Sequence, residues 1–246
     1  MAEWDLSSGP PEFQKKLWLQ WLALLVCWTG WLMNYFLTIR TAWRDRVSGV
    51  SLISLCNNLA WESVFAIFYR PPHRIGSAVW LTWMLVDVYV VYVSSKFTPQ
   101  SPADSHPHPL HAYLPALKVL GFFGCLSGHL ALAMYLGRTK AFFWGGLFCQ
   151  VVLSASALDL LVRRGHTRGT SCNMWLCRFI GSASAVSGLF LRAIYWPSEW
   201  GWADNTLMRW FTLAFLAMDT LYGVIYFYIV RSEPQRQGRP DPIKGN

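Results

Sequence analysis

The chain has 246 residues, of which 54% are hydrophobic and only 14% are charged. Its apolar residues gather in long blocks, which excludes an ordinary soluble domain and predicts a polytopic membrane protein. The net charge of +8 does not indicate nucleic-acid binding, because Lys and Arg lie mostly in the connectors and the tail, as is usual in membrane proteins.

The apolar blocks approach the roughly 20 residues that cross a bilayer core. We therefore expect an all-α, seven-transmembrane-helix bundle that forms a single integral membrane domain over residues 1–246. The run from Pro99 to His111 and the polar tail 231–246 are too poor in apolar residues to pack independently. The predicted helices cover about residues 16–39, 50–69, 74–95, 113–137, 141–162, 173–195 and 206–230.

The orientation of the bundle follows from its basic residues. Connectors one, three and five together with the tail carry eleven Lys and Arg, against six in the N-terminus and the other connectors. This asymmetry predicts a cytoplasmic C-terminus. The first helix lacks a basic leading segment and is too long for a signal-peptide core, so we expect a retained anchor in a multi-pass protein of the endoplasmic reticulum.

The second predicted helix contains Asn58 and Glu62 within an otherwise apolar segment. An ionisable side chain at membrane depth is unfavourable by several kcal/mol and by default indicates function. The two residues are four positions apart and share a helix face, so the Asn58 amide can hold the Glu62 carboxyl group by a hydrogen bond.

Other polar residues interrupt the next helices. Asp87 is a second buried acid that can pair with a polar neighbour, and His129 either lines a cavity or satisfies a neighbouring carbonyl group. Arg178 and Arg192 are fourteen residues apart on roughly one face. They either counter Asp87 or Glu62 or extend toward opposite interfaces, and we favour the second interpretation.

The last helix contains Asp219, with Tyr222 and Gly223 one turn later on the same side. Glu62 lies 12 residues after the predicted start of its helix, and Asp219 lies 11 residues before the predicted end of the last one. In an antiparallel layout these distances start from the same membrane face, so the two acids are expected at nearly equal depth in one site.

Two carboxyl groups kept from water favour a state in which one is protonated. Aromatic residues make up 16% of the chain, including 15 Trp, and aromatic faces attract cations. A dry aromatic pocket with a protonating acid suits carbocation chemistry.

Nearly the whole chain resembles the small integral-membrane terpene cyclases of fungal meroterpenoid and indole-diterpene (paspaline-type) biosynthesis. The order and spacing of several fragments together carry this resemblance. They are Asn58-Leu59-Ala60-Trp61-Glu62, Gly128-His129-Leu130-Ala131-Leu132, Cys149-Gln150 with Leu153-Ser154, Thr167-Arg168-Gly169, Trp175-Leu176 with Arg178-Phe179, Leu191-Arg192 with Tyr195-Trp196-Pro197, and Asp219 with Tyr222-Gly223.

The resemblance implies a cyclase that acts on an epoxidised farnesyl or geranylgeranyl chain attached to an aromatic or indole head group. It also implies an upstream prenyltransferase and epoxidase. The family's acids on the second and last helices match Glu62 and Asp219. Our hypothesis is that Glu62, oriented by Asn58, protonates the terminal epoxide, while Asp219 shares the proton or holds its partner; which acid donates stays open.

Further candidates for substrate contact are Asn58, Trp61, Tyr222 and His129. We expect no metal and no cofactor, because the chain has neither a DDxxD-type cluster for magnesium nor a DxDD acid motif. The main alternative is a seven-helix transporter or receptor that uses buried acids for protons or ligands. A non-catalytic scaffold would leave Glu62 and Asp219 unexplained.

Overall fold

The computed structural model describes residues 5–71, 74–97 and 113–237. The regular structure of this part is helical, without strands. The Pro99–His111 run and the tail beyond residue 237 lie outside the described residues. The α-helices are α1 Pro11–Gln14, α2 Leu17–Asp45, α3 Leu52–Ser63, α4 Arg74–Lys96, α5 Leu114–Leu136, α6 Arg138–Arg164, α7 Cys172–Tyr195, α8 Pro197–Trp200 and α9 Thr206–Gln237.

Each of the predicted apolar blocks forms a helix, but the count of seven spans is not confirmed. Within the described residues, six helices are long and apolar enough to cross a membrane, namely α2, α4, α5, α6, α7 and α9. The remaining block, Leu52–Phe68, consists of α3 and a π-helical turn and falls into the class of shorter apolar helices. Within the bundle, α3 contacts α4, α5 and α6.

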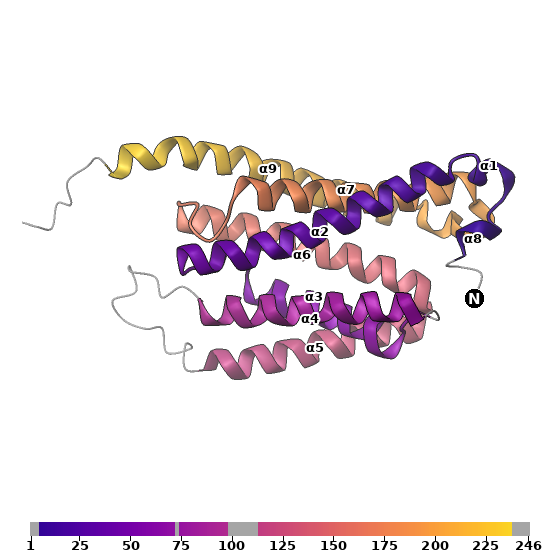
Figure 1. Cartoon of the computed structure of the whole chain (residues 1–246), viewed down its shortest axis with the longest axis horizontal. Coiled ribbons are helices and arrows are strands. Elements are labelled where there is room, and N and C mark those ends of the chain that lie inside the picture. The colour runs from indigo at the N-terminus through magenta and orange to yellow at the C-terminus, as the bar shows by residue number, and fades with distance from the viewer. Residues whose placement is uncertain (1–4, 72–73, 98–112, 238–246) are drawn as a thin grey trace, which may run out of the picture.

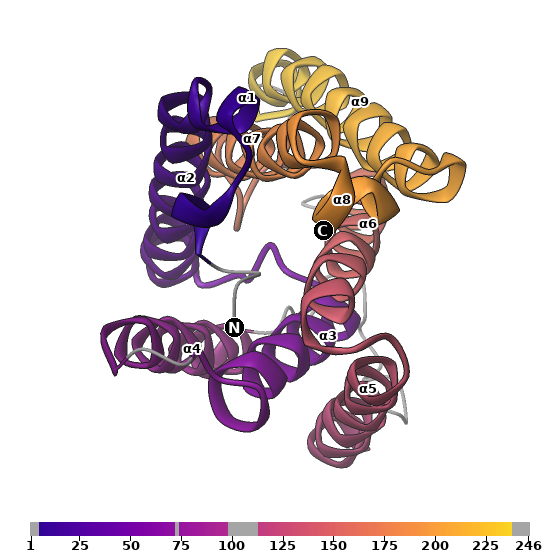
Figure 2. The same ribbon diagram turned by 90° about the vertical axis from the view of Figure 1, so that its right-hand side faces the viewer.

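The long helices surround a common axis (Figure 1). Seen from one end, α2, α7, α9, α6, α3 and α4 follow one another around a ring, and each contacts the next (Figure 2). Helix α5 lies outside this ring against α3 and α6. In this ring α4 lies between α3 and α2, and α9 lies between α6 and α7.

Glycine permits the close approach of α2 and α7. A Cβ atom added to Gly30 of α2 would lie 2.7 Å from the backbone oxygen of Cys177 in α7. Small residues at such crossings let the helix backbones approach closely. Membrane bundles rely on this close packing, because helices in lipid gain little from the hydrophobic effect when they associate. Elsewhere Gly137, at a φ of +77°, is the single residue between α5 and α6 and reverses the chain there.

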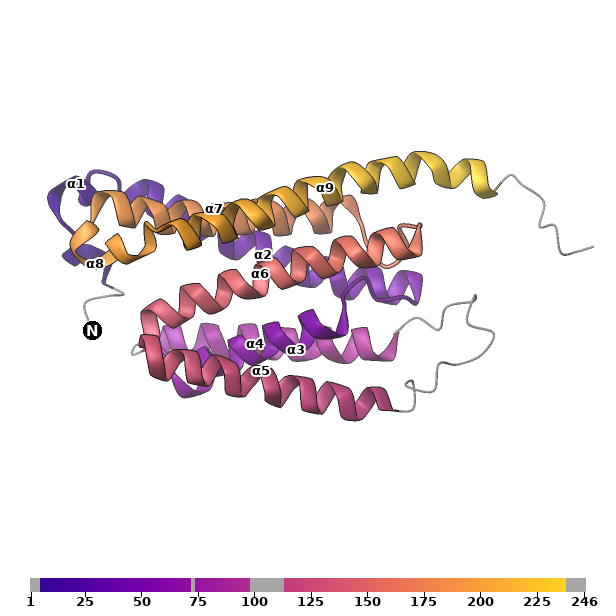
Figure 3. The same ribbon diagram turned by 180° about the vertical axis from the view of Figure 1, so that it is seen from behind.

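Helix α9 is longer than the sequence predicts. It continues through residues assigned to the tail and ends at Gln237, past the end of α6 (Figure 3). Glu233, in this extension, accepts hydrogen bonds from the backbone N–H of Thr167 at 2.6 Å and from its hydroxyl group. The Glu233 carboxylate thus accepts hydrogen bonds from Thr167 in the connector between α6 and α7. These bonds attach the polar extension of α9 to the rest of the fold.

Candidate active site

Glu62 lies near the C-terminal end of α3 and is almost fully buried, with 1% of its surface exposed. Its Oε1 atom accepts hydrogen bonds from the Tyr35 hydroxyl group at 2.5 Å, from Asn58 Nδ2 at 3.1 Å and from Trp83 Nε1 at 3.1 Å. Its Oε2 atom is buried and has no hydrogen-bond partner within the described part of the chain. The carboxyl group therefore has one oxygen crowded with donors and one without any.

The predicted bond between Asn58 and Glu62 is present, and it is part of a larger network. Asn58 Nδ2 also lies 2.7 Å from the Tyr35 hydroxyl oxygen and 3.3 Å from Asp87 Oδ2. Asp87, in α4, is 2% exposed. We name these residues and Trp83 the Glu62 network; they come from α2, α3 and α4.

Aromatic rings surround this network. The Tyr35 ring packs edge to face against Trp31 and Trp83, with centroids 5.9 and 5.8 Å apart. Such geometry orients ring edges and faces specifically, and the faces attract positive charge. Two aromatic side chains, Tyr35 and Trp83, thus contact Glu62, whereas the aromatic-lined pocket expected from composition stays a prediction.

Directly after α3 the chain forms a π-helical turn, Val64–Phe68, in which the Tyr69 N–H donates to the Val64 carbonyl group at 2.8 Å. Such turns insert one extra residue into a helix and occur frequently at functional sites. Here the turn begins two residues after Glu62, so it sets the direction in which the chain leaves the acid.

Asp219 belongs to a different network on α6, α7 and α9. It is fully buried, and its Oδ1 atom lies 2.6 Å from Arg178 Nη2. Gln150 Nε2 donates to Asp219 Oδ2 at 3.3 Å, and the Ser182 hydroxyl group donates to Gln150 Oε1 at 2.8 Å. We name this set the Asp219 network; it contains a full ion pair, whereas no cation bonds the described Glu62 network.

The two networks are built from different halves of the helix ring: α3, α4 and α2 follow one another around it, and α6, α9 and α7 complete it (Figure 2). No hydrogen bond or ion pair among the described residues joins Glu62 to Asp219. The residue count that predicted equal depth no longer applies, since α9 ends at Gln237 instead of residue 230. A site shared by the two acids thus stays a prediction.

The favoured interpretation of Arg178 and Arg192 as interfacial side chains is wrong. Arg178 is 7% exposed and pairs with Asp219, which is neither of the two acids considered as its partner. Arg192 is 5% exposed, and its guanidinium lies 4.6 Å from the Trp200 ring centroid. Ion pairing and a cation–π contact hold the two charges inside the protein.

Tyr222 lies close to the Asp219 network. Its ring centroid is 5.2 Å from the Arg178 guanidinium carbon, and its hydroxyl group is 2.6 Å from Thr170 Oγ1. Trp175 Nε1 donates to the Asp219 backbone oxygen at 2.7 Å. The sequence-predicted proximity of Tyr222 and Asp219 is confirmed, whereas contact of Tyr222 with a substrate stays a prediction.

Trp61 and His129 form their hydrogen bonds with groups other than the Glu62 carboxyl group. Trp61 Nε1 donates to the Phe142 carbonyl group at 3.0 Å, and its ring lies in an aromatic cluster with Phe142. His129 Nε2 lies 3.0 Å from the side-chain oxygen of Asn57, as expected for a histidine that satisfies a neighbour. Both make structural contacts, and their role in substrate binding stays a prediction.

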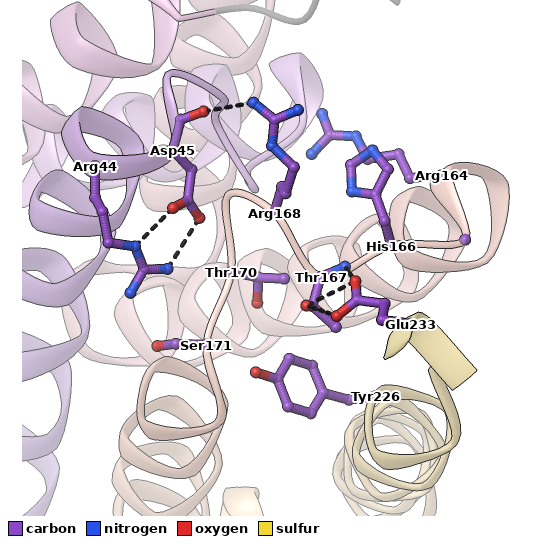
Figure 4. Close-up of a pocket in the computed structure, with 11 residues that line it drawn as sticks. Arg44, Asp45, Arg164, His166, Thr167, Arg168, Thr170, Ser171, Tyr226 and Glu233 are labelled. Carbon is purple, nitrogen blue, oxygen red and sulfur yellow. Dashed lines mark hydrogen bonds and ion pairs between the residues drawn. The ribbon is translucent and has the colours of Figure 1, made fainter. Parts of the chain in front are cut away.

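A cavity of about 510 Å³ lies elsewhere, at the end of the bundle where the connector 165–171 meets α2 and α9 (Figure 4). Its charges pair locally: Arg44 binds Asp45, whose backbone oxygen accepts from Arg168. Burial and the nearby guanidinium groups of Arg164 and Arg168 lower the pKa of His166. The lining lacks both predicted acids, so this cavity is not the candidate acid site.

Sequence reasoning missed Tyr35 and Trp83 as partners of Glu62, and Arg178 as the partner of Asp219. One signal was available for Trp83, which precedes Asp87 by four residues and so shares its helix face. No group of three or more His, Cys, Asp or Glu that could hold a metal ion occurs within the described ranges.

Comparison with known proteins gives matches over almost the whole chain. The family model of Pyr4-like transmembrane terpene cyclases matches residues 4–232. Terpene cyclase esdpB of Penicillium shearii is 58% identical over 233 residues, which are 95% of this chain and 94% of that protein. Terpene cyclase cle7 of Aspergillus versicolor is 50% identical over 234 residues, 95% of this chain and 96% of that protein. Terpene cyclase olcD of Penicillium canescens is 45% identical over 235 residues, 96% and 95% of the two chains.

Proposed function

Because the chain belongs to the Pyr4-like transmembrane terpene cyclases, a membrane enzyme family of fungal secondary metabolism, we propose that it cyclises an epoxidised prenyl chain carried on an aromatic or indole head group. The prenyl chain is a farnesyl or geranylgeranyl group. A prenyltransferase and an epoxidase supply this substrate, and the enzyme resides in the endoplasmic reticulum membrane with its C-terminus in the cytoplasm.

The observation that carries the proposal is the asymmetry of the Glu62 carboxyl group. Three donors bond Oε1, while Oε2 is buried and unbonded within the described structure. In a protonated carboxyl group the carbonyl oxygen accepts hydrogen bonds and the other oxygen carries the proton. Glu62 Oε2 is thus the atom with a proton available for a substrate.

The proposed reaction begins with transfer of that proton to the epoxide oxygen. The Glu62 O–H bond breaks and leaves a carboxylate, while the epoxide C–O bond breaks and leaves a hydroxyl group and a carbocation. The donors on Oε1 stabilise the carboxylate as it forms. Neighbouring double bonds then attack the cation in a prefolded chain, and loss of a proton from carbon ends the cascade.

Asp219 takes a different role, because its ion pair with Arg178 holds it as a carboxylate. The ion pair supports a role for Asp219 as the partner of Arg178, and we therefore assign the proton donation to Glu62. We propose that Asp219 keeps the Arg178 charge and the adjoining Tyr222 ring in place beside the substrate chain. Trp61 and His129 support the helix surfaces around it, and no metal ion or cofactor takes part.

Product analysis tests the proposal. Membranes containing the parent protein or its Glu62→Gln variant are supplied with an epoxyfarnesyl or epoxygeranylgeranyl aromatic compound. We expect cyclised product from the parent and at least about a 100-fold loss in Glu62→Gln, since general acid catalysis typically contributes this much.

Asp159→Asn is the matched control, because Asp159 is an exposed carboxylate paired with Arg163 at the end of α6. This variant should keep parental turnover. Product formation by Glu62→Gln at the parental rate would remove Glu62 from the mechanism. Failure of the parent to cyclise any of the epoxides would count against the substrate class.

A further inference from the structure

Asp87 is a buried acid to which the proposed reaction assigns no role, yet it lies within the Glu62 network. It belongs to α4, one helical turn after Trp83, and its Oδ2 atom lies 3.3 Å from Asn58 Nδ2. Trp83 and Asn58 both donate to Glu62 Oε1. Asp87 is therefore linked to Glu62 through Asn58. Among the described residues, no hydrogen bond joins Asp87 to Glu62 directly.

The Asn58 amide has two different ends, and its surroundings select which one faces the acids. The Tyr35 hydroxyl oxygen, Glu62 Oε1 and Asp87 Oδ2 all lie within 3.3 Å of Asn58 Nδ2. A carboxylate only accepts hydrogen bonds. With the amide reversed, its oxygen would face the Asp87 carboxylate, and these two buried acceptors would oppose one another without a donor between them.

The direction of this amide decides where the Glu62 proton lies. Asn58 Nδ2 is one of the three donors that bond Oε1, and together they leave Oε2 as the oxygen that carries hydrogen. If the amide turned its oxygen toward Glu62, that oxygen would attract the acid proton to itself. The proton would then be engaged by Asn58 instead of being available to an epoxide.

We infer that Asp87 is a positioning residue for the cyclisation, which directs the Asn58 amide toward Glu62 and so keeps the transferable proton on Glu62 Oε2. This inference rests on the proposed function. Asp87 neither gains nor loses a proton in the step, because the proton passes from Glu62 Oε2 to the epoxide oxygen alone. Asp87 instead sets the geometry from which Glu62 reacts.

A double-mutant cycle tests the inference, with turnover of an epoxyfarnesyl or epoxygeranylgeranyl aromatic compound as the readout. Asp87→Asn keeps the size of the side chain but offers an amide that can face Asn58 in either direction. We expect kcat to fall about 10- to 100-fold, the range of one hydrogen bond to a charged group, with KM within about twofold of the parent. Asp87→Glu restores a carboxylate and should keep more activity than Asp87→Asn.

The coupling of Asp87 to Asn58 separates positioning from a general structural role. In an Asn58→Leu background, Asp87→Asn should lower kcat by less than about twofold further, because the hydrogen bonds that link Asp87 to Glu62 through Asn58 are already removed. In an Asp159→Asn background, it should lower kcat by its full factor, since Asp159 is an exposed carboxylate outside both networks. Protein amount in membranes and unfolding in detergent show that each variant is folded.

Two results would overturn the inference. One is parental kcat in Asp87→Asn, and the other is the full Asp87→Asn loss repeated in the Asn58→Leu background. Both leave the proposed function standing as long as Glu62→Gln is inactive. Parental activity of Glu62→Gln would instead overturn the proposed function itself, so the two failures are distinguishable.

Discussion

Replacement of Asp219 by Asn tests what holds α7 and α9 together inside the bundle. Arg178 Nη2 lies 2.6 Å from Asp219 Oδ1, and the two side chains are only 9% and 0% exposed. Asn keeps the shape of the residue and can still accept the hydrogen bond that Gln150 Nε2 donates. It removes the negative charge, however, and leaves the guanidinium group of Arg178 buried without a counter-charge.

The expected effect is large because the pair is buried. Removal of one partner from a buried ion pair reduces the free energy of unfolding by about 3–5 kcal/mol, since the remaining charge is uncompensated. The chain offers an exposed counterpart in Arg209 and Asp204, whose side chains are 63% and 40% exposed. Solvent screens such a pair, so Asp204→Asn should lower the free energy of unfolding by at most about 1 kcal/mol.

Denaturant unfolding of the purified protein in detergent micelles, followed by tryptophan fluorescence, measures this difference. We expect Asp219→Asn to unfold at clearly lower denaturant concentration than Asp204→Asn. The double variant Arg178→Met/Asp219→Leu removes both charges and should recover much of the lost stability, because the two residues act as one unit.

Equal unfolding midpoints for Asp219→Asn and Asp204→Asn would refute the view that this ion pair stabilises the bundle. A double variant as unstable as the sum of its single variants would refute the coupling. The measurement also bears on catalysis, since loss of activity in Asp219→Asn counts as a chemical effect only where the variant is folded.

Two further predictions concern helix packing and pH. Gly30→Ala should destabilise the bundle by about 1–3 kcal/mol, because its Cβ would lie 2.7 Å from the Cys177 backbone oxygen. Gly124→Ala, with nothing within 4 Å of its Cβ, should be neutral or stabilising by up to about 1 kcal/mol; similar unfolding of the two would contradict this packing. Burial and two neighbouring guanidinium groups lower the pKa of His166, so the folded state favours its neutral form. Stability should be fully present above the ordinary His pKa of about 6.5 and decrease as pH falls below it. The decrease should be smaller in His166→Gln, and identical pH profiles of unfolding midpoints would disprove this origin.

The sequence by itself determined the features that depend on residues close together in the chain. Long apolar blocks predicted the helices, and the four-residue spacing of Asn58 and Glu62 predicted a hydrogen bond that the structure contains. A three-residue spacing, which also places two side chains on one helix face, linked Asp219 to Tyr222. Such pairs are set by the helix repeat, which is independent of how helices are arranged.

Only the tertiary structure decided which helices supply the partners of each acid. Tyr35 and Trp83 reach Glu62 from α2 and α4, and Arg178 reaches Asp219 from α7. The rotation of each helix about its own axis determines these partners. In a membrane both the lipid-facing and the protein-facing sides of a helix are largely apolar, so the pattern of apolar residues does not reveal that rotation. Arg178 was therefore placed at the interface by its sequence and in a buried ion pair by the fold.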